Sequence, residues 1–291
     1  MEQSLLSAVS GIDANQTYLD VIGNNIANAN TTGYQAQDVD FTDLMSQQLA
    51  GATAPTLPNN GGLNPLAVGT GVRIGAITED QTEGAPQLTG NPSDVAIQGK
   101  GYLVAIQNGQ QLYTRAGDLT VDATGNLVTS TGALVQGWEA PGGAAGALTA
   151  GTIPQPPAAT SGITIPTGLT NATGATLESY SVGGDGVISG AFSDGTSSPI
   201  AQLALASVTD PNGLDAIGNS MFTVTPNSGA AVIGAPGAGG LCTLLGGNLE
   251  TSNVDLSDQL TNLIVAQEAY QANTKVVTTT STVLQSLMAM Q

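Results

Sequence analysis

The chain has 291 residues, of which 22 are Asp or Glu, four are Lys or Arg and none is His, so its formal net charge is −18. Nucleic acids and anionic membranes are bound through basic surfaces, and four cations spread over this length cannot form one. Without His, and with Cys242 as the single cysteine, the sequence lacks a Ser/His or Cys/His couple, an imidazole or thiolate metal site and an internal disulfide. We therefore expect no enzyme, no catalytic residues, no cofactor and no metal.

The first residues, MEQSLLSAVSGIDANQ, contain no positive segment followed by an apolar run, so we expect no cleaved secretory signal. No stretch reaches the ~18 consecutive apolar residues that cross a bilayer, so we expect no membrane insertion. We therefore expect the chain to be cytoplasmic or to leave the cell by a secretion pathway that does not use a cleaved signal peptide.

The N-terminal residues 1–30 predict a helix. Apolar or small residues recur at alternating intervals of three and four, and one Asn interrupts the series, which is the pattern of a heptad seam. The seam consists of Leu5, Ala8, Ile12, Asn15, Leu19, Ile22 and Ile26. The Asn/Gly-rich run Gly23–Gly33 has the composition of a helix end followed by a turn.

Residues 31–70 predict an extended connection that includes a Gly/Pro-rich stretch at 50–66. Asp38, Asp40 and Asp43 are spaced by two and three positions, with no loop Gly among them. A calcium loop needs such a Gly and further oxygen ligands, so we interpret these carboxylates as a solvated face and not as a metal cluster.

Residues 71–139 and 181–254 together predict one β-rich body, either an antiparallel sheet or a barrel-like arrangement. Two short strands flank Asn108-Gly109, whose residues both tolerate positive φ, and this is a strong hairpin signal. Three further hairpins are expected, with their turns at residues 123–126, 183–186 and 193–195 and a strand on each side of each turn.

Three other features of the body can be interpreted from the sequence. Residues 200–208 alternate apolar residues in the manner of a strand. Trp138 at the end of a strand and Cys242 in a Gly-rich segment are interpreted as packing residues. Residues 140–180 are rich in Gly, Pro, Ala and Thr, and we expect a small outer insert there.

The C-terminal residues 255–291 predict a second helix, which Asp255 or Ser257 can cap, with acidic Asp258 in its first turn. The heptad pattern returns in this segment. Its seam consists of Leu256, Leu260, Leu263, Gln267, Tyr270, Thr274, Val277, Ser281, Leu284 and Met288.

Seams at both ends predict that the terminal helices pair as an α-helical coiled coil. Several apolar residues lie off the seam, so we expect the pair to be weakly ordered alone and to become ordered when copies assemble. A dimeric zipper and a simple intramolecular hairpin also fit the pattern. Neither helix, however, has the Glu–Lys pairs that a dedicated dimer uses to choose its partner.

Three sets of motifs, in this order along the chain, resemble one known family. They are SAVSG at Ser7–Gly11 with LDVIGNNIANANTTGY at Leu19–Tyr34, GNPSDVAIQGKGY at Gly90–Tyr102 with YTRAG at Tyr113–Gly117, and GNLETSNVDL at Gly247–Leu256 with AYQAN at Ala269–Asn273. These segments are similar to the signatures of the bacterial flagellar rod and hook proteins. Within that family, Ile264–Gln267 and Gln202–Ala206 are most similar to hook segments, with a distal rod subunit as the alternative.

The resemblance implies a structural subunit that leaves the cell through the flagellar type III export apparatus and assembles helically into a hollow tube. In the hook, such a tube is a flexible universal joint that transmits torque from rod to filament. In the distal rod, it is a stiff drive shaft. The implied location is extracellular, in the hook or basal body, with the terminal helices lining the inner tube and the β domains outside. The implied partners are further copies, distal rod, hook cap and hook–filament junction proteins.

The residues expected to contact neighbouring subunits come from the two helices and the turn after the first. They are Leu5, Ile12, Leu19, Ile22, Ile26, Asn24, Asn25, Asn28, Leu256, Leu260, Leu263, Tyr270, Val277 and Leu284. A secreted adhesin or carbohydrate-binding module built on residues 88–140 and 180–250 is a further alternative. It leaves the two terminal seams without a role.

Overall fold

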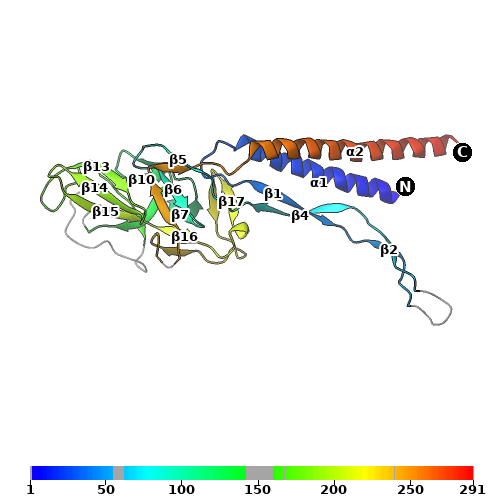
Figure 1. Ribbon diagram of the computed structural model, residues 1–291, viewed down its shortest axis with the longest axis horizontal. Coiled ribbons are helices and arrows are strands. Elements are labelled where there is room, and N and C mark those ends of the chain that lie inside the picture. The colour runs from blue at the N-terminus through cyan, green and yellow to red at the C-terminus, as the bar shows by residue number, and fades with distance from the viewer. Residues whose placement is uncertain (1, 55–61, 142–159, 167, 239, 291) are drawn as a thin grey trace. The chain divides into compact units, whose positions relative to one another are not determined.

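A computed structural model describes residues 2–54, 62–141, 160–166, 168–238 and 240–290 (Figure 1). By their contacts they form two compact units. The first contains both long helices and the segment Ala36–Asp80, and the second contains Asn28–Gln35 and Gln81–Asn253. The chain therefore passes between the units four times, after residues 27, 35, 80 and 253. The expected mixture of two helices and an antiparallel β-rich part is confirmed.

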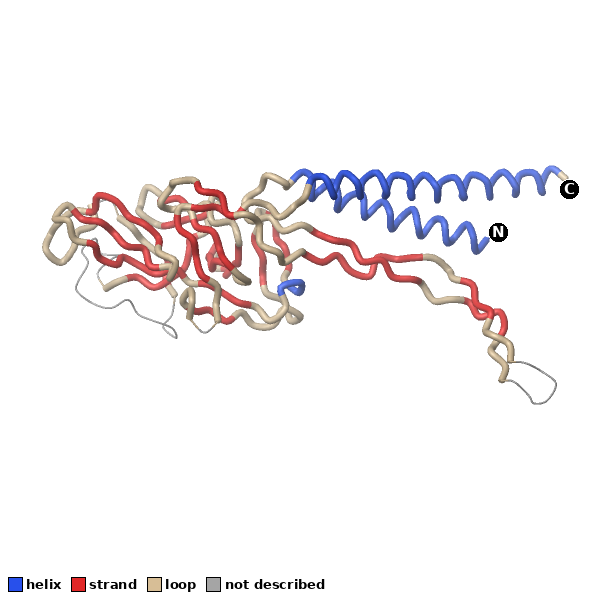
Figure 2. Tube along the Cα trace, viewed as in Figure 1, coloured by secondary structure: helices blue, strands red, loops and turns tan. Residues whose placement is uncertain are grey.

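Helices α1 (Glu2–Ala27) and α2 (Leu256–Ala289) lie side by side and antiparallel in the first unit (Figure 2). Both predicted helices are confirmed. Of the two expected caps, Asp255 is the one used, because its Oδ1 accepts hydrogen bonds from the backbone N–H groups of Ser257 at 2.8 Å and Asp258 at 3.4 Å. Neither of these two described helices has the length and hydropathy to cross a membrane.

A two-stranded ribbon completes the first unit. Strand β1 (Gln37–Asp43) pairs antiparallel with β4 (Val72–Glu79), and β2 (Gln47–Ala50) pairs with β3 (Leu66–Val68). Asp38, Asp40 and Asp43 are all exposed on β1, as a solvated face requires. Of the Gly/Pro-rich stretch expected at 50–66, residues 55–61 lie outside the described residues.

The second unit is built on a 13-stranded antiparallel sheet. Its main path has the order β13-β14-β15-β11-β7-β8-β18-β17, and β9, β10, β12, β16 and β19 branch from it. Two separate pairs, β5 with β21 and β6 with β20, lie in the same unit. The strands are β5 (Pro86–Leu88), β6 (Val95–Gln98), β7 (Tyr102–Gln107), β8 (Gln110–Thr114), β9 (Leu119–Val121), β10 (Leu127–Thr129), β11 (Leu134–Glu139), β12 (Ser161–Gly162), β13 (Leu177–Val182), β14 (Val187–Phe192), β15 (Ser197–Leu203), β16 (Leu205–Ser207), β17 (Asp215–Gly218), β18 (Met221–Thr223), β19 (Val232–Gly234), β20 (Thr243–Gly246) and β21 (Asn248–Glu250).

The hairpins expected from turn residues are present. Asn108 and Gly109, with φ of 52° and 79°, connect β7 to β8, and both values lie in the left-handed region that a tight two-residue hairpin needs. Strand β9 pairs with β10, β13 with β14, and β14 with β15, each antiparallel across its predicted turn.

The strand expected over residues 200–208 is present, but the burial of its side chains does not alternate. The segment is divided between β15 and β16 at Ala204, and every residue from Ile200 to Ala206 is buried. Gln202 is buried as well, and its Nε2 donates to the backbone oxygen of Asp185 at 2.9 Å. The segment is covered on both faces, so the polar side chain finds its partner inside the unit.

Residues expected in an outer insert also contribute to this core. Residues 142–159 and 167 of the expected insert 140–180 lie outside the described residues. Ile163, Ile165 and Leu169 are buried in the same hydrophobic cluster as Trp138, and β12 pairs with β11. The described end of this segment therefore belongs to the body of the second unit.

Trp138 and Cys242 are both buried in this cluster, which confirms their interpretation as packing residues. Burial raises the pKa of the Cys242 thiol, so the side chain is a neutral, apolar group at ordinary pH.

Candidate functional site

The two helices contact each other along a seam of mostly small and polar side chains. In α2 a series of partly or fully buried positions recurs at intervals of four and three, with Ala266 only 1% exposed and Thr280 9% exposed, and Asn262 and Ala269 beside this series are partly buried as well. The seam consists of Gln259, Leu263, Ala266, Tyr270, Asn273, Val277 and Thr280.

This seam corrects half of the one expected for α2. Leu263, Tyr270 and Val277 are shared, but the alternate positions 260, 267, 274 and 281 are exposed, and the residues one place earlier face α1. Leu260, for example, is 53% exposed. The predicted and observed seams therefore differ by one residue at every second position, and the closely packed helices place small or amide side chains there.

The close approach of the helices is visible at Gly11 of α1. A Cβ atom at this position would lie 2.7 Å from Nδ2 of Asn273, nearer than real Cβ contacts allow. Ala8 and Ala14 on the same helix are buried. Small residues on α1 therefore let the backbone of one helix come close to the side chains of the other.

A second face of α1 packs against the ribbon. The ring of Tyr18 meets that of Phe41 edge to face, with centroids 5.5 Å apart. Asn25 binds the backbone of β1 twice: its Nδ2 donates to the oxygen of Gln37 at 2.8 Å, and its Oδ1 accepts from the Gln37 N–H at 2.9 Å. Ser10 Oγ accepts from the N–H of Val72 at 3.3 Å. Helix α1 is thus packed against both α2 and the ribbon.

The residues expected to contact neighbouring subunits fall into three groups by exposure. Two are buried within the first unit, namely Ile22 and Asn25. Eight are partly exposed, namely Leu5, Ile12, Leu19, Ile26, Asn28, Leu263, Tyr270 and Val277. Four are exposed, namely Asn24, Leu256, Leu260 and Leu284. The buried pair is occupied by contacts within the chain, so the structure separates it from the others.

Helix α2 carries a large exposed apolar surface, partly on the sides that α1 does not cover and partly beyond the end of α1. At about 1.5 Å per residue its 34 residues extend about 51 Å, against about 39 Å for the 26 residues of α1. Its C-terminal part therefore has no α1 residues beside it. We call the outer apolar face of α2 the set Leu256, Leu260, Ile264, Val265, Val276, Val283, Leu284, Leu287, Met288 and Met290, each at least 40% exposed.

The ribbon is a second exposed apolar surface, which the sequence patterns did not indicate. Its strands and their flanks expose Phe41, Met45, Leu49, Leu63, Leu66, Val68 and Ile77. Isolated two-stranded ribbons are marginal in water, so apolar residues exposed on such a ribbon are candidates for contact with another molecule.

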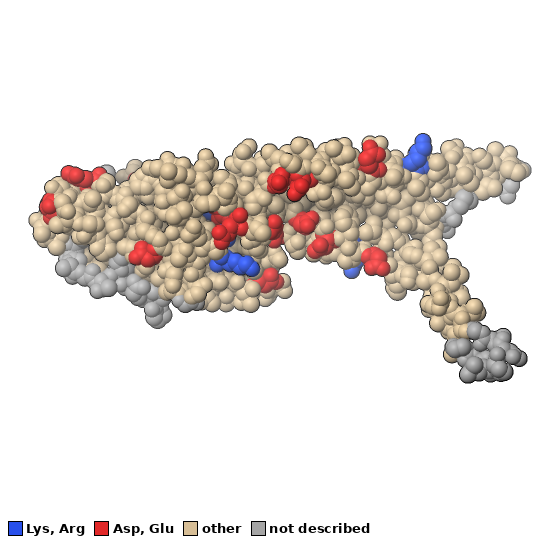
Figure 3. Space-filling model, in the orientation of Figure 1, with Lys and Arg blue, Asp and Glu red and all other residues tan. Residues whose placement is uncertain are grey.

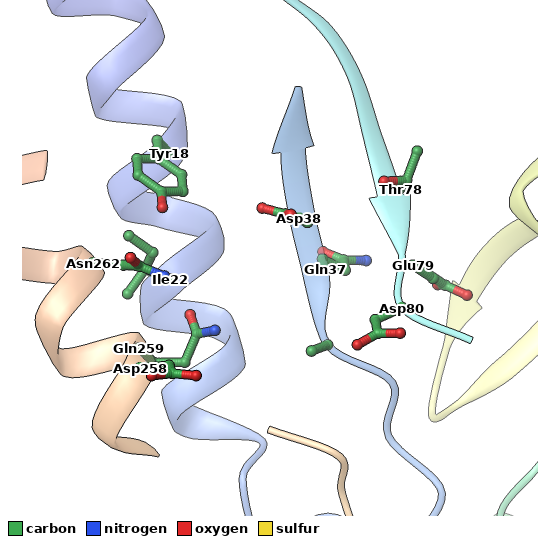
Figure 4. Close-up of a pocket in the computed structure, with 11 residues that line it drawn as sticks. Tyr18, Ile22, Gln37, Asp38, Thr78, Glu79, Asp80, Asp258, Gln259 and Asn262 are labelled. Atoms are coloured by element: carbon green, nitrogen blue, oxygen red, sulfur yellow. The ribbon is translucent and has the colours of Figure 1, made fainter. Parts of the chain in front are cut away.

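A pocket of about 390 Å³ lies between α1, α2 and the ribbon (Figure 4). Its walls include the four carboxylates Asp38, Glu79, Asp80 and Asp258. Asp38 points from β1 toward Tyr18, and burial together with this negative charge raises the pKa of the Tyr18 hydroxyl. Burial also raises the pKa of Glu79.

The pocket offers an acidic, polar surface and no reactive couple. Oε2 of Glu79 is buried and has no hydrogen-bond partner among the described residues. The described residues contain no group of three or more His, Cys, Asp or Glu side chains arranged to hold a metal ion. On the face seen in Figure 3, acidic side chains are scattered and basic ones are few.

Three family models match the chain. Residues 5–35 match the model described as flagella basal body rod protein, residues 96–190 the flagellar hook protein FlgE/F/G D1 domain, and residues 245–290 the flagellar basal body rod FlgEFG protein C-terminal model.

Similar curated proteins correspond to the chain over nearly its whole length. The flagellar basal-body rod protein FlgG of Bacillus subtilis is 38% identical over 289 residues, which cover 99% of this chain and 98% of the relative. FlgG of Caulobacter vibrioides is 36% identical, with 98% and 97% covered. The flagellar hook protein FlgE of Treponema pallidum is 27% identical over an alignment of 463 positions, with each chain fully covered.

Proposed function

The chain belongs to the family of flagellar rod and hook proteins, and from this premise we propose that it is a subunit of the distal rod. As a member of this family it is a structural component of the bacterial flagellum, in the hook or basal body, and not an enzyme. The choice between rod and hook is the proposed part. It reverses the order of preference that the sequence motifs suggested.

The observation that carries the proposal is the correspondence in length with the rod relatives. FlgG of Bacillus subtilis aligns over 289 residues with 38% identity. The hook relative from Treponema pallidum needs 463 positions to align with the 291 residues of this chain, at 27% identity. A hook protein of that kind contains a large part with no counterpart here.

The exposed apolar surfaces supply the means of assembly. We propose that the outer apolar face of α2 and the ribbon pack against neighbouring copies in a helical tube. At about 25 cal/mol per Å² of buried apolar surface, covering ten large side chains on α2 alone provides several kcal/mol per subunit. The expected coiled-coil packing of the terminal helices, with these helices lining the tube, is part of the same proposal.

The division of the chain into functional parts also belongs to this proposal. Helices α1 and α2 are assigned to the inner tube, the ribbon segment Ala36–Asp80 to the connection and the second unit to the outer body, so the sequence-based bounds 31–70 and 71–139 are shifted to place β4 in the connection. Export through the flagellar type III apparatus and contacts with hook, cap and junction proteins are proposed with it.

The test is the shape of the polymer. The purified chain is polymerised from seeds of basal bodies and imaged by electron microscopy. A straight tube supports the distal rod, and a curved tube supports the hook. Monomers that never polymerise would contradict both.

Ile264→Lys on the outer apolar face tests the assembly surface. This change is expected to prevent polymer growth, because it places a charge where apolar surface is buried. The matched control is Gln110→Lys, which adds the same charge at the exposed first residue of β8 in the second unit. Equal polymer growth of the two variants would contradict the proposed role of α2 in assembly.

A further inference from the structure

Arg115 and Glu250 form a buried ion pair in the second unit, the one ion pair among the described residues. Their side chains are 1% and 5% exposed. Arg115 donates from Nη2 to Oε1 of Glu250 at 3.0 Å and from Nε to Oε2 at 3.1 Å, so both carboxylate oxygens are engaged. The chain thus commits one of its four cations to a site that solvent does not reach.

The ion pair also forms hydrogen bonds with backbone groups of three glycines. Arg115 Nη1 donates to the carbonyl oxygens of Gly99 at 3.2 Å and Gly101 at 3.4 Å, and Oε1 of Glu250 accepts from the N–H of Gly84 at 3.2 Å. An apolar pair of similar volume can stabilise a core as well as a buried ion pair does. What the charged pair adds is a set of directed contacts, so its specific contribution is to position the segments that it binds.

Two segments that connect the units contact this pair, one through the backbone of Glu250 and one through its carboxylate. Gly33 N–H donates to the backbone oxygen of Glu250 at 2.9 Å, which attaches the segment that follows α1. A Cβ at Gly33, where φ is +64°, would lie 2.7 Å from the N of Ala116, so this segment lies directly against the residues that follow β8, Arg115 among them. Gly84, which is bound to the carboxylate, belongs to the segment that leaves the ribbon.

The same segments are bound to each other. Gln81 Nε2 donates to Oε1 of Gln35 at 3.1 Å, and Asn253 Nδ2 donates to the carbonyl oxygen of Thr82 at 3.0 Å. The N–H of Thr251 donates to the oxygen of Ala85 at 3.1 Å. All four passages of the chain between the units start from residues 28–35, 81–85 or 250–253, and these three segments meet around one ion pair.

We propose that Arg115 and Glu250 are a clamp that fixes the connecting segments on the second unit. The proposal concerns the position of these segments and not the stability of the sheet. It holds for the isolated chain, so it does not depend on whether the polymer is a rod or a hook.

The test replaces the clamp with an apolar pair, Arg115→Met/Glu250→Met, and follows amide hydrogen exchange in the monomer. The expected result is exchange about a hundredfold faster at Gly33 and Gly84, with little change in the β7–β8 hairpin. If Gly33 and Gly84 stay protected, or lose protection only in step with the hairpin, the clamp is refuted. Should the double variant fail to fold, Glu250→Asp keeps the charge, shortens the reach and is judged by the same criterion.

Leu169→Ala is the control, because it removes buried apolar contacts in the core of the second unit. It is expected to lower the protection of the Gly33 amide, the Gly84 amide and the hairpin amides from exchange by similar factors. A selective loss at the two glycines in this control as well would mean that the segments respond to any loss of stability, and the proposal would fall.

Discussion

Gly11 of α1 faces Asn273 of α2 so closely that a Cβ on the glycine would lie 2.7 Å from the amide nitrogen of the asparagine. Gly23, on the same helix, has no atom within 4 Å of its Cβ position. Substitutions at these two glycines therefore test two effects apart, helix packing at Gly11 and helix propensity at Gly23. We expect Gly23→Ala to stabilise α1 by about 1 kcal/mol, because alanine is the better helix former.

Gly11→Val is expected to have the opposite effect, since its branched side chain displaces the Asn273 amide from the helix interface. Thermal unfolding followed by helical circular dichroism measures both variants. If Gly11→Val unfolded no earlier than a Gly23→Val variant, which carries the same propensity cost without the contact, the close approach would have no role in stability.

The seam of α2 gives a second prediction. Ala266 is buried against α1, whereas Gln267, the residue that the heptad pattern placed in the seam, is exposed. Ala266→Leu overfills the interface and is expected to cost about 1–3 kcal/mol. Gln267→Leu is expected to change the unfolding free energy by less than about 0.5 kcal/mol. If denaturant titrations showed a larger loss of unfolding free energy for Gln267→Leu than for Ala266→Leu, the seam predicted from the sequence would be the correct one.

This one-residue shift shows which parts of the structure the sequence can predict. Hairpins such as the one at Asn108-Gly109 depend on local backbone preferences, and those predictions are confirmed. The helices also follow from local periodicity. The choice between Gln267 and Ala266, however, depends on how closely α1 approaches, which is a tertiary property that hydrophobic spacing does not report.

The same limit explains the other differences. Residues 200–206 are buried on both faces, and a strand of that kind has no alternation to detect. Ile163 and Leu169 lie in a segment whose Gly and Pro content resembles that of a linker, yet both are in the core. The clamp of Arg115 and Glu250 joins residues 135 positions apart, and nothing local predicts it.

Asn25 gives a third prediction. Its side chain exchanges two hydrogen bonds with the backbone of Gln37, and it is buried. Asn25→Ala is expected to cost about 1–3 kcal/mol, because removing the amide leaves polar groups without these partners. Amide exchange in β1 measures the loss. The control is Gln16→Ala on an exposed position of the same helix, and equal exchange in the two variants would contradict the anchoring of the ribbon by Asn25.

Glu79 gives a prediction for pH. Burial raises the pKa of its carboxyl above the usual value, with a hydrogen bond from Gln37 opposing the shift. The folded first unit therefore binds this proton more readily than the unfolded chain, so the contribution of Glu79 to stability falls as pH rises from the unfolded pKa through the folded one. Acidification through that window strengthens the ribbon around β4.

Glu79→Gln mimics the protonated form and is expected to remove this part of the pH dependence while stabilising the ribbon at neutral pH. Amide exchange in β4 at two pH values is the measurement. Glu268→Gln changes an exposed carboxylate of α2 and is expected to leave the dependence intact. A pH profile that is the same for wild type and Glu79→Gln would show that Glu79 does not titrate in this window.

The charge of the chain gives the last prediction. A formal charge of −18 is repeated on every copy, so assembly brings acidic surfaces together. The screening length falls from about 30 Å at 0.01 M salt to about 3 Å at 1 M, and polymer growth is expected to accelerate over that range.

Salt also strengthens apolar contacts, so a control must separate the two effects. The triple variant Asp38→Asn/Asp40→Asn/Asp43→Asn removes three exposed charges from β1 and leaves the apolar surface unchanged. Sedimentation of polymer should show faster growth than wild type at low salt and a shallower salt dependence for this variant. If wild type grew faster at low salt, electrostatic repulsion between copies would not oppose assembly.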